Sequence, residues 1–241
     1  KRNALIPSMI IDMIDYLEQA RRDHEVRAIV LKGGGGNFCA GDDLHHSKEE
    51  RFEFGQPDLH TRLRTGYPRL VIDIMTMRKP VVAMVQGYAY GGGFDLALAC
   101  DIRIASDKAR FAEVFVRRGM IPASGGTYFL PRIVGIDKAL LMVWTGDMVD
   151  AKEAERIGLV TMVVPHEELE MAAMDLAEKL AKGPPLAIQR SKRAIYEGLE
   201  MNLEETFKYI APIMQELNAT EDHKEGARSF VEKREPVFKG E

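Results

Sequence analysis

Three consecutive glycines, residues 91–93, separate two segments of different character in the 241-residue chain. The preceding run, residues 81–85, is short, apolar and rich in β-branched residues, which favours a buried strand. The following run, residues 94–100, is rich in Leu and Ala and favours a helix. Glycines let the backbone turn sharply and approach a ligand closely. Since the first N–H groups of a helix lack internal partners and lie at the positive end of its dipole, the junction suits an oxygen that gains negative charge.

A second glycine-bearing loop follows another apolar run, residues 26–32, and ends in Ala40, Gly41 and Asp42. Two backbone N–H groups from separate loops can converge on one carbonyl oxygen and stabilise an enolate or a tetrahedral oxyanion. The two loops together therefore indicate chemistry on a carbonyl compound.

The spacing of the residues does not match the motifs of nucleotide binding, of a serine nucleophile or of a metal site. Neither glycine cluster completes G-x-G-x-x-G, because Phe38 and Leu96 stand where the third glycine is needed, and no G-x-x-x-x-G-K-[ST] occurs. Ser124 lacks the first glycine of a nucleophile elbow. The Asp and His residues within 42–46 are neighbours whose side chains diverge, and no second cluster has ligand spacing, so we expect no metal site.

Composition narrows the class of protein further. A net charge of −4 argues against binding to a nucleic-acid backbone. No apolar run approaches the roughly 20 residues needed to cross a bilayer, and the two cysteines, Cys39 and Cys100, suit a reducing compartment. The chain begins at Lys1 without Met, so we expect its natural start to be missing. We expect a cytoplasmic protein with no nucleic-acid or membrane partner.

Strands and helices that position these loops alternate along the chain. Strands are expected at residues 26–32, 81–85, 101–105, 109–114 and 159–164, and helices at 6–22, 70–77, 94–100, 127–134, 139–144, 151–157 and 167–181. Residues 47–66 are polar and are expected to form a mobile segment that covers the site. Further helices are expected at 186–196, 203–217 and 223–232. The change to pure helix near residue 165 favours an α/β core with a helical C-terminal extension.

The sequence resembles the crotonase (enoyl-CoA hydratase/isomerase) superfamily over nearly its whole length. The resemblance is carried, in this order, by Asn3-Ala4-Leu5, residues 38–44, Lys79-Pro80-Val81 and residues 87–101, 119–127, 144–147, 151–160 and 230–234. It implies an α/β fold with a crotonase-like spiral of ββα units at residues 1–183, its leading hairpin missing, and a C-terminal helical trimerisation region at residues 184–241. It also implies an acyl-CoA thioester ligand and a homotrimer or dimer of trimers. No separate cofactor is expected, because coenzyme A is part of the substrate.

Position by position, the resemblance implies an oxyanion hole made by the backbone N–H groups of Asp42 and Gly92. The implied substrate-binding positions are Ala4, Ala40, Asp42, Asp43, Leu44, Gly91, Gly92 and Phe115. Lys1 and Arg2 stand near where the phosphates of coenzyme A are expected. If Phe115 faces the acyl pocket, it favours a bulky or aromatic acyl group.

The acid/base positions differ from those of the family's hydratases. These enzymes have one glutamate three residues after the middle glycine, where this chain has Asp95, and another four residues before the glycine of the G-x-x-P loop, where it has Phe115. Two carboxylates there activate water and deliver a proton to the α-carbon. Asp95 also suits the first turn of a helix without any catalytic duty. Glu113 would share the face of Phe115 in a strand, so a small register shift would turn it inward; otherwise it is a solvated strand residue.

The sequence therefore predicts an acyl-CoA enzyme of the enoyl-CoA hydratase/isomerase type that stabilises a thioester enolate. The candidate catalytic residues are Asp42, Gly92, Asp95 and Glu113. Because both glutamate positions differ, we expect very slow hydration of crotonyl-CoA. Isomerisation, thioester hydrolysis or decarboxylation in the same oxyanion hole stay as alternatives, as does a catalytically weak acyl-CoA-binding protein.

Overall fold

The computed structural model describes residues 2–43 and 66–241. The strands are β1 (Ile29–Lys32), β2 (Val81–Val85), β3 (Tyr88–Tyr90), β4 (Ile102–Ser106), β5 (Arg110–Ala112), β6 (Val149–Asp150) and β7 (Met162–Val164). The helices are α1 (Pro7–Arg22), α3 (Gly66–Thr76), α4 (Gly92–Ala99), α5 (Gly126–Val134), α6 (Ile136–Thr145), α7 (Ala151–Arg156), α8 (Leu169–Lys182), α9 (Pro185–Gly198), α10 (Leu203–Asn218) and α11 (Glu221–Glu232). Two 3-10 turns, η1 (Val114–Arg118) and η2 (His166–Glu168), complete the described elements.

The described strands form two sheets. One is wholly parallel in the order β1-β2-β4-β7, and the other has the order β3-β5-β6, with β6 antiparallel to β5. Strand β2 is a central strand, and all of its residues are buried. A strand covered on both faces needs apolar side chains at every position, which accounts for the uninterrupted apolar run that the sequence contains there.

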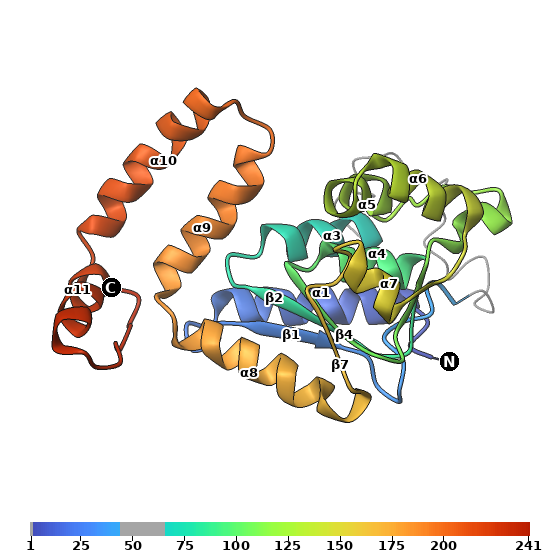
Figure 1. Ribbon diagram of the computed structural model, residues 1–241, viewed down its shortest axis with the longest axis horizontal. Helices are drawn as coiled ribbons and strands as arrows, with labels where there is room; N and C mark the ends of the chain where they lie inside the picture. The colour runs from blue at the N-terminus through green and yellow to red at the C-terminus, as the bar shows by residue number, and fades with distance from the viewer. Residues whose placement is uncertain (1, 44–65) are drawn as a thin grey trace.

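Helices cover both faces of the parallel sheet. Val82 and Met84 of β2 pack with Ile104 in the cluster beneath α8, whereas Val81 and Val85 point into the main core shared with α1, α3 and α4. Figure 1 shows α8 on one side of the sheet and α1 and α3 on the other. This alternation follows from the two-residue period of a strand. It fixes β2 between the two layers of helices and so determines the position of the glycine junction that follows it.

Helix α4 directly follows that junction and is buried along its whole length. Gly91 precedes it with φ 51° and ψ −124°, a conformation that a side chain would strain. An ideal Cβ on Gly93 would lie only 2.3 Å from the carbonyl oxygen of Cys39. Glycine is therefore required for α4 to lie directly against the loop at residues 39–41.

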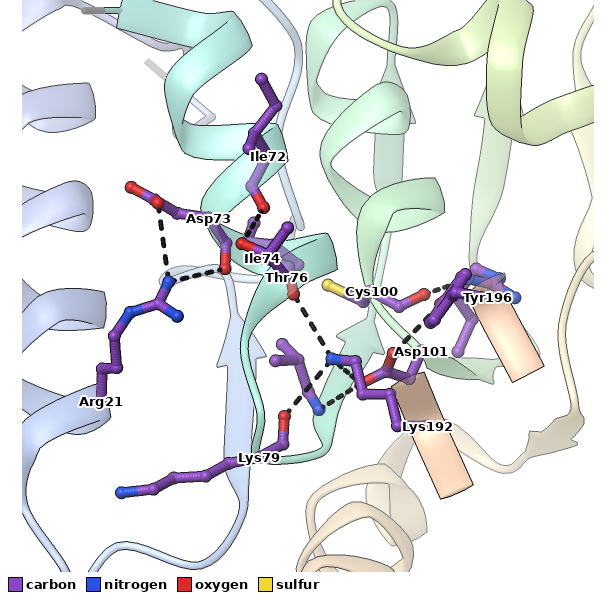
Figure 2. Close-up of polar contacts among 12 residues, drawn as sticks. Arg21, Ile72, Asp73, Ile74, Thr76, Lys79, Cys100, Asp101, Lys192 and Tyr196 are labelled. Atoms are coloured by element: carbon purple, nitrogen blue, oxygen red, sulfur yellow. Dashed lines mark hydrogen bonds and ion pairs between the residues drawn. The ribbon is translucent and has the colours of Figure 1, made fainter. Parts of the chain in front are cut away.

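The C-terminal helices α9, α10 and α11 extend away from the sheets (Figure 1), and polar contacts in the C-terminal half of α9 attach it to the core. Asp101, just after α4, accepts hydrogen bonds from Lys192 Nζ at 2.8 Å, Tyr196 Oη at 3.1 Å and the backbone N–H of Val81 at 2.8 Å. Figure 2 shows Lys192 and Tyr196 reaching from α9 toward this carboxylate. Because the Asp101 and Lys192 side chains are only 15% and 10% exposed, they form a largely desolvated ion pair.

We expect Asp101→Ala to lower the free energy of unfolding by about 3 kcal/mol, because it leaves the buried ammonium of Lys192 without its charged partner. Urea-induced unfolding would measure the loss. Glu200→Ala is the matched control, since it removes an ion pair with Arg132 whose side chains are 38% and 61% exposed, and it should cost at most about 1 kcal/mol. Equal effects of the two substitutions would show that Asp101 does not anchor α9.

The expected elements at residues 81–85 and 203–217 agree closely with β2 and α10, and the other expected helices differ mainly at their ends. The short strands β3 and β6 were not expected. The strand expected at residues 109–114 is wrong at its C-terminal end, because β5 stops at Ala112 and η1 begins at Val114. Within the described parts of the chain, we find no helix long and apolar enough to cross a membrane.

Candidate active site

The two glycine-bearing loops lie side by side. The N–H of Cys39 donates to Tyr88 O at 2.9 Å, and the N–H of Tyr90 donates to Cys39 O at 3.0 Å. An ideal Cβ on Gly41 would lie 2.9 Å from Tyr90 O and 3.6 Å from the nitrogen of Gly92. Gly41 and Gly92 are thus in close contact, and the loop end at Asp42 meets the start of α4.

Backbone hydrogen bonds on both sides of Asp42 fix the position of the first loop. Leu5 N–H donates to Gly41 O at 2.8 Å, and Asp43 N–H donates to Leu5 O at 3.0 Å. Gly92 is the first residue of α4, where a helical N–H has no acceptor inside the helix. The structure therefore brings together the two residues whose N–H groups the resemblance assigns to an oxyanion hole.

Two carboxyl groups, those of Asp95 and Glu113, meet next to this junction. Both residues are fully buried. An ideal Cβ on Gly126 would lie 2.3 Å from Asp95 Oδ1 and 2.6 Å from Glu113 Oε1, so both oxygens face the same glycine. Asp95 Oδ2 accepts a hydrogen bond from Ser124 N–H at 3.2 Å. Apart from the interaction between the two carboxyl groups themselves, no described residue forms a hydrogen bond with Asp95 Oδ1 or with either Glu113 oxygen.

The buried environment raises the pKa values of both carboxyl groups. Burial raises the pKa of Asp95 to about 7. Burial, and then the nearby charge of Asp95, raise the pKa of Glu113 to about 10. Near neutral pH, the pair therefore retains a proton that it can donate, and its ionised oxygen can accept one. Neighbouring carboxyl groups with raised pKa values are typical of acid/base catalysts.

The structure corrects the expectation for Glu113 and Phe115. They do not share a strand face, because Glu113 adopts φ −89° and ψ 76° beyond the end of β5, and Phe115 lies in η1. The alternative of a solvated Glu113 is also wrong, since the residue is buried. The buried ring of Phe115 packs on the glycine junction, with Cζ 3.6 Å from an ideal Cβ on Gly91.

The remaining expected substrate-binding residues lie around the first loop. Ala40 N–H donates to Arg2 O at 3.1 Å, which holds the N-terminal segment containing Ala4 along this loop. Ala4, Ala40 and Asp43 are half-buried. Arg2 is exposed, and its guanidinium lies 5.2 Å from the centre of the Tyr88 ring. Lys1, Leu44 and the expected mobile segment up to residue 65 lie outside the described residues.

One polar side chain of this site was not identified from the sequence. Tyr67, in the first turn of α3, is 3% exposed, and its hydroxyl would lie 2.7 Å from an ideal Cβ on Gly92. Within the described part of the chain, this hydroxyl has no hydrogen-bond partner. Its position could not be recognised by spacing, because α3 starts before the expected helix at residue 70 and only the folded chain brings it against α4.

Comparison with known proteins agrees with this architecture. The sequence model of the enoyl-CoA hydratase/isomerase family matches residues 1–241. The chain is 38% identical to (E)-benzylidenesuccinyl-CoA hydratase of Thauera aromatica and 36% identical to 2,3-dehydroadipyl-CoA hydratase of Escherichia coli, in each case over 99% of this chain and 91% of the relative. A crystal structure of enoyl-CoA hydratase from Bacillus anthracis superposes with a TM-score of 0.89 at 34% identity, covering 99% of this chain and 91% of that one.

These matches and the fold define the protein as a crotonase-fold enzyme that acts on acyl-CoA thioesters. More narrowly, the chain belongs to the enoyl-CoA hydratase/isomerase family.

Proposed function

We propose that the protein hydrates a 2-enoyl-CoA thioester, with Asp95 and Glu113 as its acid/base pair and the N–H groups of Asp42 and Gly92 as its oxyanion hole. The observation that carries this proposal is the pair of buried carboxyl groups that face Gly126. Very slow hydration is expected from the sequence because the family's two glutamate positions hold only one carboxylate, that of Asp95, with Phe115 at the other. Glu113 supplies a second carboxyl group from a different position, which removes the reason for that expectation.

The proposed reaction uses the two carboxyl groups in opposite protonation states. The Asp95 carboxylate accepts a proton from water as the water oxygen bonds to the β-carbon. The π electrons of the double bond move toward the thioester oxygen, where the N–H groups of Asp42 and Gly92 stabilise the enolate. The protonated Glu113 then delivers its proton to the α-carbon, and the proton that Asp95 took from water passes to Glu113 before the next turnover. One water is added in total, and the reaction needs no separate cofactor since coenzyme A is part of the substrate.

A product assay on the purified protein tests this proposal. Crotonyl-CoA and cinnamoyl-CoA offer a small and a bulky aromatic acyl group, and a 3-enoyl-CoA offers a substrate for isomerisation. Hydration removes the absorbance of the conjugated thioester and gives a product heavier by one water. A product of unchanged mass would indicate an isomerase instead, and free coenzyme A a thioester hydrolase. Binding without any turnover would support the weak acyl-CoA-binding alternative and contradict hydration.

We propose further that the protein acts as a homotrimer or dimer of trimers in the cytoplasm. The C-terminal helices support this assembly, because their exposed side chains include Phe207 at 59%, Phe230 at 85% and Val231 at 78% exposure. Large apolar side chains on projecting helices are typical of surfaces covered by other copies of a chain. Light scattering at micromolar concentration should give the mass of three or six chains, and a clean monomer would contradict the proposal. The unpaired Cys39 and Cys100 support a reducing compartment.

A further inference from the structure

The hydroxyl of Tyr67 occupies an unusual position for a buried phenol. Apart from the interaction between the two carboxyl groups themselves, most of the buried side-chain polar atoms that lack a partner in the described residues are gathered at this site, namely Tyr67 Oη, Asp95 Oδ1 and the two carboxyl oxygens of Glu113. A buried tyrosine normally hydrogen-bonds through its hydroxyl, because leaving that group unpaired away from water is unfavourable. A site that retains such a group has a donor available for a bound ligand.

The geometry places this donor within reach of the same oxygen as Gly92. Tyr67 Oη would lie 2.7 Å from an ideal Cβ on Gly92. Because N and Cβ on one Cα are separated by about 2.5 Å, Tyr67 Oη lies within about 5 Å of Gly92 N. An oxygen about 2.9 Å from Gly92 N can therefore also lie at hydrogen-bond distance from the tyrosine hydroxyl.

The protonation state of Tyr67 suits donation. Burial is the main cause that holds the pKa of Tyr67 well above its usual range. The electrostatic influence of four neighbouring acidic groups acts in the same direction, namely those of Cys39, Asp42, Asp95 and Glu113. The phenol thus keeps its proton at neutral pH. The carboxyl oxygens of Asp95 and Glu113 face Gly126, whereas the hydroxyl of Tyr67 faces Gly92, and no hydrogen bond joins the hydroxyl to these oxygens in the structure.

We propose that Tyr67 is a third hydrogen-bond donor to the thioester oxygen, beside the N–H groups of Asp42 and Gly92. An enolate oxygen carries enough lone-pair density to accept from three donors, and each donor fixed in a dry site stabilises the negative charge that develops there. The inference rests on the proposed function, because it requires a thioester in the oxyanion hole. It adds a side-chain donor, supplied by α3, to the two backbone donors.

Infrared difference spectroscopy tests the contact without any need for turnover. Butyryl-CoA labelled with ¹³C at the thioester carbon has no double bond to hydrate, and hydrogen bonds to its carbonyl oxygen lower the stretching frequency. Bound to the unmodified protein, the band should lie below its frequency in solution. Bound to Tyr67→Phe, it should move back toward higher frequency. Tyr128→Phe is the matched control, since Tyr128 lies on α5 in edge contact with Phe129, and it should leave the band unchanged.

Kinetics and stability give two further readouts for Tyr67→Phe. Loss of one oxyanion donor should lower kcat on the order of 100-fold, with a small change in KM. Thermal stability should be unchanged or raised, because the substitution removes a buried group that has no partner.

An unchanged carbonyl band in Tyr67→Phe would overturn the inference while leaving the proposed function intact. Failure of the unmodified protein to bind butyryl-CoA would overturn both. A lowered stability with an unchanged band would assign Tyr67 a purely structural role.

Discussion

Glu113→Gln is expected to reduce the turnover of an enoyl-CoA by about 100–10,000-fold, the usual cost of losing one positioned acid or base. Glutamine keeps nearly the shape of the side chain against Gly126 but has no proton to deliver to the α-carbon. Substrate binding should change little, so the loss should appear in kcat and not in KM. Initial rates from the absorbance of the conjugated thioester would measure it.

The control for this substitution is Glu167→Gln, in the exposed 3-10 turn η2 before α8, which should keep full activity. Asp95→Asn should lower kcat to a similar degree. The double variant should lose much less than the product of the two single losses, because the two groups act on one reaction. A Glu113→Gln enzyme with unchanged kcat would show that the buried carboxyl pair is not the acid/base pair.

Glu113→Gln should also make the protein more stable than the unmodified one. The folded state holds the pKa of Glu113 at about 10, above the ordinary glutamate value of 4.5, so the folded protein binds more protons than the unfolded chain between these values. Stability then falls as pH rises through this interval. Glu113→Gln removes that dependence, so its advantage in urea-induced unfolding should be larger at about pH 9 than at about pH 6. An advantage that does not grow with pH would contradict the raised pKa.

Gly92→Pro is expected to lower turnover by about 100–1,000-fold, because it deletes one backbone donor of the proposed oxyanion hole. Gly92 is the first residue of α4, and proline is well tolerated at the first position of a helix, where its missing N–H has no intrahelical role. Circular dichroism would check that the variant folds despite the close contact of its Cβ with Tyr67 Oη.

The matched variant is Gly92→Ala, which keeps the N–H but adds the same Cβ close to Tyr67 Oη. Both substitutions carry the steric cost of the Cβ, so the ratio of their kcat values measures the loss of the N–H together with the effect of the proline Cδ that replaces its hydrogen. Equal kcat values for the proline and alanine variants would show that Gly92 does not donate to the substrate.

The glycine junction could be predicted from the sequence because its signals are local. The apolar run of β2, the three glycines at residues 91–93 and the Leu- and Ala-rich residues of α4 all lie within a short segment. Glu113 could be named only as a candidate, since its burial depends on β5 ending at Ala112 and on the distant Gly126 making room for it. Tyr67 could not be identified at all, because its proximity to Gly92 is created by the packing of α3 on α4.

The two ends of helix α4 lie at different regions of the molecule, one at the candidate active site and the other at the attachment point of α9. Its first residue, Gly92, borders the proposed oxyanion hole, and its last is followed by Cys100 and by Asp101, which holds Lys192 and Tyr196 of α9. An eight-residue helix is about 12 Å long, and α4 is enclosed by packed side chains throughout. The same short helix therefore positions both the N–H of Gly92 and the carboxylate of Asp101 that anchors α9.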